Sequence, residues 1–498
     1  MKTIKTLIKL LATSLLLSGC SSLPPEIAPE SSYAKYNYKQ LVDAYPIKKS
    51  ATPSVGDSKL LVIPVWFNDS ETYIKADKRS VIRDDIRKAY FGFEEDIGWE
   101  SVSTYYQKDS FGKASISGEV SSWYECDKLS TYYYEDNDDR TAKLVLEAVQ
   151  WYKVNNPTVD MKDFDKDSDG YLDGVVLIYA APNHQSLKID QDNLWAYCYW
   201  TRVSSNVNAP TANAFFWASY DFMYDSETAL TKTGLTNFGG GYNTNGLLID
   251  THTYIHEMGH LFGLEDYYDY AEDGYLPAGG YSMQDMNVGS HDPFSRLSLG
   301  WAKALVPVES STFDVKPVES SGEIVVLSDN YTGSPFDEYI ILELYSPNGL
   351  NSRDSTYRYG NKYPMGPKLY GVRVWHVDAR LVDVTDQSSA YLTTSIVEGH
   401  KYINATNNTS SGDRAKNYGG KYSYNLNQLI RNNEKAEYNS KYVFGVSDLF
   451  QTGDSFSLSK YQTQFDQKNK LNNGKSFDWT IKFNYVGSNK MNISCIVR

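Results

Sequence analysis

A histidine, a glutamate and a second histidine stand at the spacing of a metal-binding helix in THTYIHEMGHLFGLEDYYD (residues 251–269). On an α-helix, residues four apart lie on one face, so His256 and His260 can direct ring nitrogens at one metal ion. Glu257 lies beside that face, where its carboxylate can take a proton from a metal-bound water. The pattern predicts a catalytic zinc site, and the alternative is a surface helix with a charged face.

The residues after the helix extend this pattern. Gly263 follows His260 at the point where a helix can end in a conformation that glycine tolerates. A turn there would direct Asp266 back towards the metal, and carboxylate oxygen binds zinc well. The full pattern, HExxHxxGxxD, resembles the metzincin signature with a carboxylate in place of the third histidine. We therefore expect His256, His260 and Asp266 to bind zinc and Glu257 to act as the general base.

A glycine-flanked methionine turn follows in GGYSMQDMNVG (residues 279–289). Metzincins place a methionine in a tight turn beneath the metal, and we favour Met283 over Met286 for this position. The alternative is that both are core methionines, because methionine commonly fills gaps between packed side chains. Some metzincins stabilise the oxyanion with a tyrosine two positions after the methionine, where this sequence has Asp285. His291 is a candidate donor nearby, but we interpret it as a structural, hydrogen-bonding histidine.

Alternating aspartates in DFDKDSDGYLDG (residues 163–174) predict a second metal site. Alternate carboxylates in a turning loop converge on a hard cation such as calcium, as in the first half of an EF-hand loop. Position twelve of such a loop is Val176 and not glutamate, so a later aspartate would have to complete the coordination. The alternative is a solvated acidic turn, in which the carboxylates would repel one another. The expected ligands of this structural calcium are Asp165, Asp167, Asp169, Tyr171 and Asp173.

Two segments, HEMGHLFGLEDYYD and YSMQDMNVGSHDPFSRLSLGW, resemble the bacterial immune inhibitor A family of secreted zinc metalloproteases. Weaker similarity in VSTYYQKDSFGKASISGEVSSWY, DEYIILELYSPNGL and YGVRVWHVDARL extends the resemblance over most of the chain from about Leu60. The resemblance implies a zinc endopeptidase with a β-rich domain after the catalytic one. It also implies the roles given above to the two histidines, Asp266, Glu257 and Met283.

The N-terminus, MKTIKTLIKLLATSLLLSGCSS, is typical of a secretory signal, with lysines, a short apolar run and then small residues. Its end resembles a bacterial lipoprotein signal, in which the cysteine after the cleavage point carries lipid. We expect residues 1–20 to be a lipoprotein signal peptide with a lipidated Cys20. This would anchor the protein at the extracellular face of a bacterial envelope. The alternative is a plain secreted protein in which Cys20 is incidental.

Strands and helices alternate as far as about Trp301, which favours an α/β domain. We expect strands at KLLVIPVWF and GVVLIYA and helices near residues 77–90 and 140–154. After Pro307 the runs EIVVLSD, DEYIILELYS, LYGVRVWHVD, FDWTIKFNYV and NISCIVR predict antiparallel strands. We expect a flexible tether at 21–57, an α/β metzincin-like protease domain at 58–305 and an antiparallel β-rich domain, a β-sandwich, at 306–498. His376 and Asp378 should form a structural pair, and residues 404–439 an exposed insertion.

The composition excludes further classes of protein. The net charge of −14 argues against nucleic acid, because phosphate binding needs a basic surface. No segment after the signal approaches the about 18 apolar residues of a membrane span. Beyond Cys20, the remaining cysteines, Cys126, Cys198 and Cys495, allow at most one disulfide.

The sequence therefore predicts a monomeric, surface-anchored or secreted zinc metalloendopeptidase that cleaves proteins or peptides. One competing hypothesis is a non-catalytic surface-binding lipoprotein with a degenerate protease domain, whose β domain binds a host or cell-wall ligand. The intact His256, Glu257 and His260 count against it. Another keeps zinc hydrolysis but on peptidoglycan cross-links or glycan-bearing mucin.

Overall fold

The computed structural model describes residues 52–134, 138–183, 194–224, 248–269, 276–328, 331, 333–359, 363–383, 401–403, 405–407, 424–438 and 441–498. The expected signal peptide, the lipidated Cys20 and most of the expected tether lie outside these residues. Within the described ranges, no helix is both long and apolar enough to cross a membrane.

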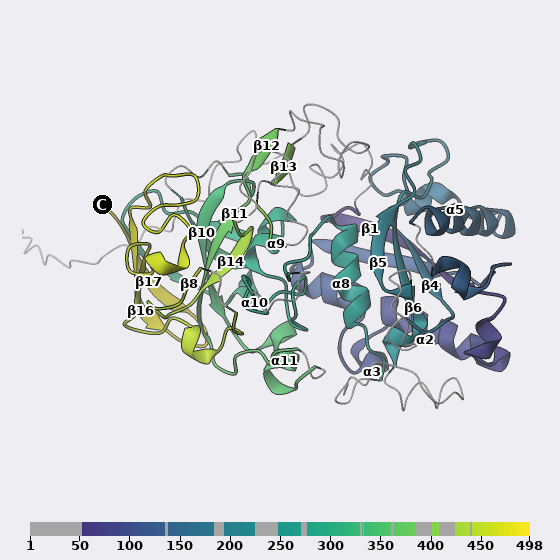
Figure 1. Ribbon diagram of the computed structural model, residues 1–498, viewed down its shortest axis with the longest axis horizontal. Helices are drawn as coiled ribbons and strands as arrows, with labels where there is room; N and C mark the ends of the chain where they lie inside the picture. The colour runs from purple at the N-terminus through teal and green to yellow at the C-terminus, as the bar shows by residue number, and fades with distance from the viewer. Residues whose placement is uncertain are drawn as a thin grey trace, which may run out of the picture.

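A six-stranded sheet forms the N-terminal part of the fold, at the right of Figure 1. The strands run in the order β2-β1-β4-β6-β5, and a short strand, β3, also pairs with β1. All pairings are parallel except that of β5, an antiparallel edge strand beside β6. The strands are β1 (Gly56–Trp66), β2 (Ala114–Val120), β3 (Tyr124–Glu125), β4 (Val175–Tyr179), β5 (Tyr197–Trp200) and β6 (Ala214–Ser219).

Helices cover both faces of this sheet, which explains why β4, and β1 from Leu60 onward, are continuously apolar. Leu60 and Val62 of β1 pack in the core that contains the buried faces of α2, α4 and α8. Leu61 and Ile63 point to the opposite face and pack against α5. The helices are α2 (Arg79–Phe91), α3 (Glu94–Ile97), α4 (Val102–Asp109), α5 (Asp138–Asn155) and α8 (His252–Leu261).

The chain joins this fold before the expected boundary at residue 58. Thr52 and Ser54 are buried. The Thr52 backbone N–H donates to the carbonyl of Leu261 at 2.8 Å, and the Trp301 indole N–H donates to the carbonyl of Ser54 at 2.6 Å. Residues 52–57 therefore belong to the folded part and not to a flexible tether.

Two sheets face each other in the β-rich part, at the left of Figure 1. One has the order β14-β11-β10-β9-β7 and the other the order β15-β16-β17-β8. Side chains from both sheets form one core cluster, which is the arrangement of a β-sandwich. The first sheet is not wholly antiparallel, because β7 pairs with β9 in parallel. Its strands are β7 (Lys303–Leu305), β9 (Glu323–Leu327), β10 (Glu338–Tyr345), β11 (Gly371–Asp378) and β14 (Asn427–Ile430).

The second sheet contains β8 (Ser311–Val315), β15 (Ser455–Ser457), β16 (Trp479–Val486) and β17 (Met491–Val497), and β12 (Leu381–Asp383) pairs separately with β13 (Lys401–Ile403). Three short helices are α9 (Pro293–Ser298), α10 (Val318–Ser321) and α11 (Ser352–Thr356). Single 3-10 turns are η1 (Ser70–Thr72), η2 (Ala76–Lys78), η3 (Ser130–Tyr133), η4 (Met161–Phe164), η6 (Tyr220–Met223), η7 (Gly349–Asn351), η8 (Val446–Asp448) and η9 (Gln462–Gln464).

The outer face of the first sheet packs against the N-terminal part. Tyr339 and Ile341 of β10 and Trp375 of β11 share a core cluster with Phe262 and Met283. The helix α8 consequently lies between the six-stranded sheet and the β-rich part (Figure 1). The fold is thus a mixed α/β region followed by a β-rich region, with a continuous core between them.

Two local expectations were wrong. His376 contacts Glu338 of the neighbouring strand, with Nε2 and Oε1 2.9 Å apart, whereas Asp378 accepts a hydrogen bond from Arg380 at 2.7 Å. In the register of β10 and β11, Glu338 lies opposite Asp378 and therefore diagonally across from His376. A diagonal neighbour on the next strand is within reach of a long side chain, so the pair formed between strands. The predicted insertion at 404–439 lies partly outside the described residues, and its described part contains the buried strand β14.

Candidate metal centre

The helix α8 carries two of the expected ligands, and a turn after it brings the third to them. His256 and His260 lie one turn apart on α8. Gly263 has a φ of +101°, a conformation that L side chains rarely adopt, and it reverses the chain towards α8. Asp266 Oδ1 then lies 3.0 Å from His256 Nε2 and 3.2 Å from His260 Nε2. One ligand atom from each residue lies within 4.8 Å of the others.

Backbone carbonyls fix the orientation of both imidazole rings. His256 Nδ1 donates to the carbonyl of Met283 at 2.7 Å, and His260 Nδ1 donates to the carbonyl of Leu264 at 2.8 Å. A neutral ring with its proton on Nδ1 leaves Nε2 free to bind a metal ion, and in both histidines Nε2 faces the metal position. The turn that contains Met283 therefore supports His256 through its backbone, while the Met283 side chain is fully buried.

Asp266 and His260 at the metal position favour their charged forms, although burial favours the neutral forms. Burial favours the neutral form of Asp266, but His260 and His256 outweigh it and hold the pKa of the Asp266 carboxyl well below its usual range. Burial also lowers the pKa of His260, but Asp266 overcomes this and raises that pKa to about 9. The Asp266 carboxylate is thus ionised, which is the form that binds a metal ion.

Glu257 is buried next to this point. Its Oε2 atom has no hydrogen-bond partner among the described residues, and burial raises the pKa of the carboxyl group. Cys198 on β5 donates a hydrogen bond from its thiol to the Glu257 carbonyl at 3.2 Å. Burial raises the pKa of the Cys198 thiol, which keeps it protonated. Sequence reasoning missed this cysteine, because no local pattern connects β5 with α8.

This donor set fits a catalytic zinc ion. Two imidazole nitrogens and one carboxylate oxygen are the protein ligands of several zinc hydrolases, in which a water takes the fourth position. The fixed ring orientations and the free Glu257 oxygen agree with this use. A surface helix with a charged face would show neither feature.

Other candidate residues near the turn have structural contacts. His291 is buried, with Nδ1 2.7 Å from Asp109 Oδ2 and Nε2 3.2 Å from Gln284 Oε1, so both ring nitrogens face other partners. Asp285 is buried and accepts a hydrogen bond from the Gly280 N–H at 3.0 Å. Burial raises the pKa of Asp285 to about 8. The described contacts thus give neither His291 nor Asp285 a role at the metal position.

The remaining cysteines form no disulfide. Cys126, Cys198 and Cys495 are all free thiols in the structure. Cys126 and Cys495 are buried in separate cores, and Cys198 is half-buried beside α8.

The acidic loop brings together three of its expected calcium ligands. Carboxylate oxygens of Asp165, Asp167 and Asp173 lie within 4.8 Å of one another. Asp169 is not part of this cluster, because its Oδ1 accepts a hydrogen bond from the Tyr171 N–H at 2.8 Å. This carboxylate instead caps the backbone of its own turn, and its expected role as a ligand stays a prediction.

Backbone N–H groups hold two of the clustered carboxylates. Asp165 accepts from the N–H groups of Asp169 and Gly170 at 3.0 and 3.1 Å. Asp173 accepts from the N–H groups of Lys59 and Lys166 at 2.7 and 2.9 Å. Burial nevertheless raises the pKa of Asp173 to about 7. The loop is thus tied to the start of β1, and the described contacts fit either a calcium loop or a hydrogen-bonded acidic turn.

Comparison with known proteins finds weak similarity over about a third of the chain. No family model matches the chain. The chain is similar to the pre-pro-metalloprotease PrtV of Vibrio cholerae serotype O1, in strain M66-2 and in strain ATCC 39315 / El Tor Inaba N16961. The identity to each is 22% over 194 residues, which cover 34% of this chain and 19% of the relative. The match thus spans about a fifth of the length of these relatives, and it supports a distant relationship to a metalloprotease.

Proposed function

We propose that this protein is a zinc metalloendopeptidase with a metzincin-type site. His256, His260 and Asp266 hold the metal, and Glu257 is the general base. The observation that carries the proposal is the convergence of two histidine Nε2 atoms and one Asp266 oxygen on a single point beside Glu257. The similarity to a metalloprotease supports the same class of activity.

The metal ion and the residues of the chain would have separate roles in the reaction. A bound zinc ion would supply a Lewis acid that polarises a peptide carbonyl and lowers the pKa of a water ligand towards neutral. Glu257 takes a proton from the attacking water and passes it to the leaving amine. Its raised pKa makes it a stronger base than a solvated glutamate. The carbonyls of Met283 and Leu264 keep the histidine rings oriented throughout.

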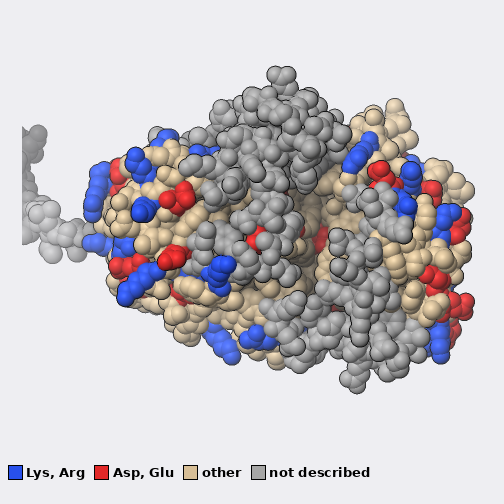
Figure 2. Space-filling view, in the orientation of Figure 1, with Lys and Arg blue, Asp and Glu red and all other residues tan. Residues whose placement is uncertain are grey.

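The location and partners belong to this proposal as well. Attachment to a bacterial surface rests on the N-terminal sequence and its Cys20. On the face shown in Figure 2, the coloured basic and acidic side chains are interspersed at both ends of the molecule. This distribution fits a protein or peptide substrate better than nucleic acid, which prefers a continuous basic surface.

The test uses cleavage of an unstructured protein, casein, by the full chain together with zinc analysis. Glu257→Ala should keep about one zinc per chain and lose cleavage by about 10²-fold or more, because it removes a general base. Asp266→Ala should lose zinc. Glu71→Ala, which changes an exposed glutamate, is the matched control and should behave as wild type. Normal cleavage by Glu257→Ala would overturn the base assignment, and full zinc occupancy in Asp266→Ala would overturn the ligand assignment.

The same measurement separates the competing functions. Zinc binding without casein cleavage, followed by hydrolysis of peptidoglycan fragments or mucin, would favour the narrower zinc hydrolase. Zinc binding without hydrolysis of any of these substrates would favour a surface-binding lipoprotein.

A further inference from the structure

Gln284 contacts the supports of all three proposed metal ligands. It directly follows Met283, whose carbonyl accepts the hydrogen bond from His256. Its own carbonyl accepts a hydrogen bond at 2.7 Å from the N–H of Tyr267, the residue after Asp266.

The side chain of Gln284 packs on the backbone next to the third ligand, His260. It lies against Gly259, the residue before His260 on α8. A Cβ atom at Gly259 would lie 2.2 Å from Gln284 Oε1 and 2.7 Å from its Cδ. The amide is therefore packed directly on the backbone of α8, and Gly259 provides the space that it occupies. Since Gln284 is completely buried, it has little freedom to move aside.

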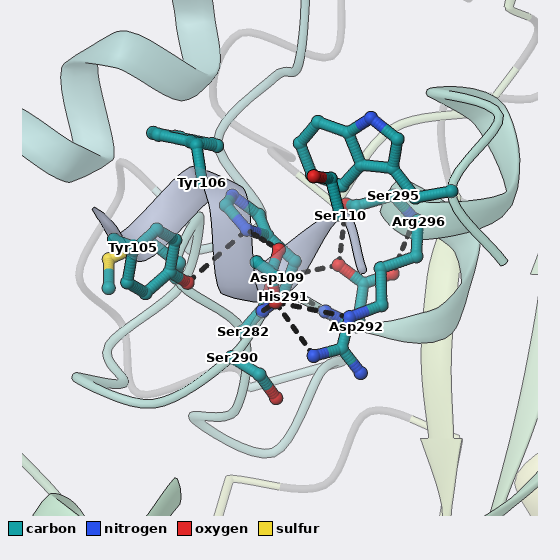
Figure 3. A network of polar contacts seen from close by, with 12 residues as sticks. Tyr105, Tyr106, Asp109, Ser110, Ser282, Ser290, His291, Asp292, Ser295 and Arg296 are labelled. Carbon is teal, nitrogen blue, oxygen red and sulfur yellow. Dashed lines mark hydrogen bonds and ion pairs between the residues drawn. The ribbon is translucent and has the colours of Figure 1, made fainter. Parts of the chain in front are cut away.

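A buried network of ionic side chains contacts Gln284 through His291. His291 lies between Gln284 Oε1, 3.2 Å from its Nε2, and Asp109 Oδ2, 2.7 Å from its Nδ1. Figure 3 shows His291 and Arg296 both directed at Asp109, and Arg296 Nη2 donates to Asp109 Oδ1 at 2.7 Å. Arg296 Nη1 also donates to Glu319 Oε1 at 3.1 Å. The network thus joins α4, the methionine turn, α9 and α10 of the β-rich part.

We propose that Gln284 is a positioning residue for the metal centre. It sets the separation between α8 and the turn that carries Asp266, and the network through His291 and Asp109 keeps it in place. The β-rich part contributes to the metal site by this route, through Glu319. The inference rests on the proposed zinc function, because positioning is defined here by metal affinity.

The test is a double-mutant cycle on zinc affinity of the full chain, measured by competition with a chromogenic zinc chelator. Gln284→Ala should raise the zinc Kd by about tenfold, the size expected when a support of metal ligands is removed. Gly259→Ala should also raise the Kd by about tenfold or more, because its methyl group displaces Gln284. In the Gln284→Ala background, Gly259→Ala should add much less, because the obstructing amide is gone.

A matched control separates positioning from stability. Gln464 is another buried glutamine, and its side chain donates to the carbonyls of Arg431 and Asn433 in the β-rich part. Gln464→Ala should lower the thermal unfolding midpoint of the zinc-free protein without changing the zinc Kd. Should Gln284→Ala not fold, Gln284→Met keeps the side-chain length but loses the hydrogen bond to His291, and it should still raise the Kd.

The experiment distinguishes a failure of this inference from a failure of the proposed zinc function. An unchanged zinc Kd in folded Gln284→Ala or Gln284→Met, or an equal effect of Gly259→Ala in both backgrounds, would overturn the inference while leaving the zinc site intact. Wild-type protein that binds no zinc would overturn the proposed function itself, and the inference with it.

Discussion

Replacing Asp109 with asparagine should remove a pH-dependent part of the stability. The Asp109 carboxylate is fully buried and accepts hydrogen bonds from Arg296 Nη2 at 2.7 Å and Nε at 3.1 Å. Burial favours its neutral form, but Arg296 and His291 outweigh this and lower the pKa of Asp109 from 3.8 to about 2. The ionised form of Asp109 is therefore more favourable, relative to its protonated form, in the folded protein than in the unfolded chain.

The sign and size of the pH-dependent change in stability follow from this difference between the folded-state and unfolded-state pKa of Asp109. A carboxyl group with a depressed folded-state pKa stabilises the fold above its unfolded pKa, and this contribution is lost as the pH falls from 3.8 through about 2. At 1.36 kcal/mol per pKa unit, the shift corresponds to about 2 kcal/mol. Asp109→Asn cannot titrate, so its destabilisation relative to wild type should be largest near pH 6. Most of this difference should be lost by pH 2, and the rest below that pH.

The assay is urea unfolding of the chelator-treated full chain between pH 2 and pH 6. Removing the metal first prevents zinc release from adding its own pH dependence. Asp84→Asn is the control, because Asp84 is only partly buried and pairs with Lys88 near the surface, where an ion pair contributes little. Wild-type and Asp109→Asn curves that stay parallel across this pH range would refute the reasoning.

Two further predictions concern the acidic loop at residues 163–174 and the N-terminus. Calcium should raise the thermal unfolding midpoint of the wild-type chain, and Asp167→Asn should reduce this rise, because the loop gathers the carboxylates of Asp165, Asp167 and Asp173. Scanning calorimetry with and without calcium tests this, and midpoints that do not respond to calcium would exclude the site. Cys20→Ser should move the chain from the membrane fraction to the soluble fraction of the producing bacterium, because lipid attachment requires the thiol. Membrane association that persists in the variant would contradict the lipid anchor.

Local sequence signals were sufficient to predict the elements that carry the candidate site. The spacing of His256 and His260 places them on one helical face, and Gly263 supplies the positive φ that returns Asp266 to them. Continuous apolar runs predicted β1 and β4, because a strand covered by helices on both faces has no polar side. Helical periodicity likewise predicted α5.

Contacts between distant segments could not be predicted in this way. Asp109 and Arg296 lie 187 residues apart, and neither belongs to a pattern that indicates the other. Cys198 contacts Glu257 only because β5 adds to the sheet edge in the antiparallel direction. Gln284 was overlooked because the methionine beside it matched a known motif, whereas the importance of its amide depends on the packing of Gly259.

The expected boundary after residue 305 also bears on the competing hypothesis of a separate binding module. That boundary divides β7 from β9, with which it pairs, and cuts through the shared core of Met283, Tyr339 and Trp375.

The β-rich part also holds the N-terminal end of α8. Tyr359 donates to Asp250 Oδ2 at 2.7 Å, and Asp250 Oδ1 accepts from the N–H of His252, the first residue of α8. Modules that function separately usually meet through small, more polar interfaces. A β-rich part that packs on both the start of α8 and the methionine turn fits better with one structural unit than with a separate binding module.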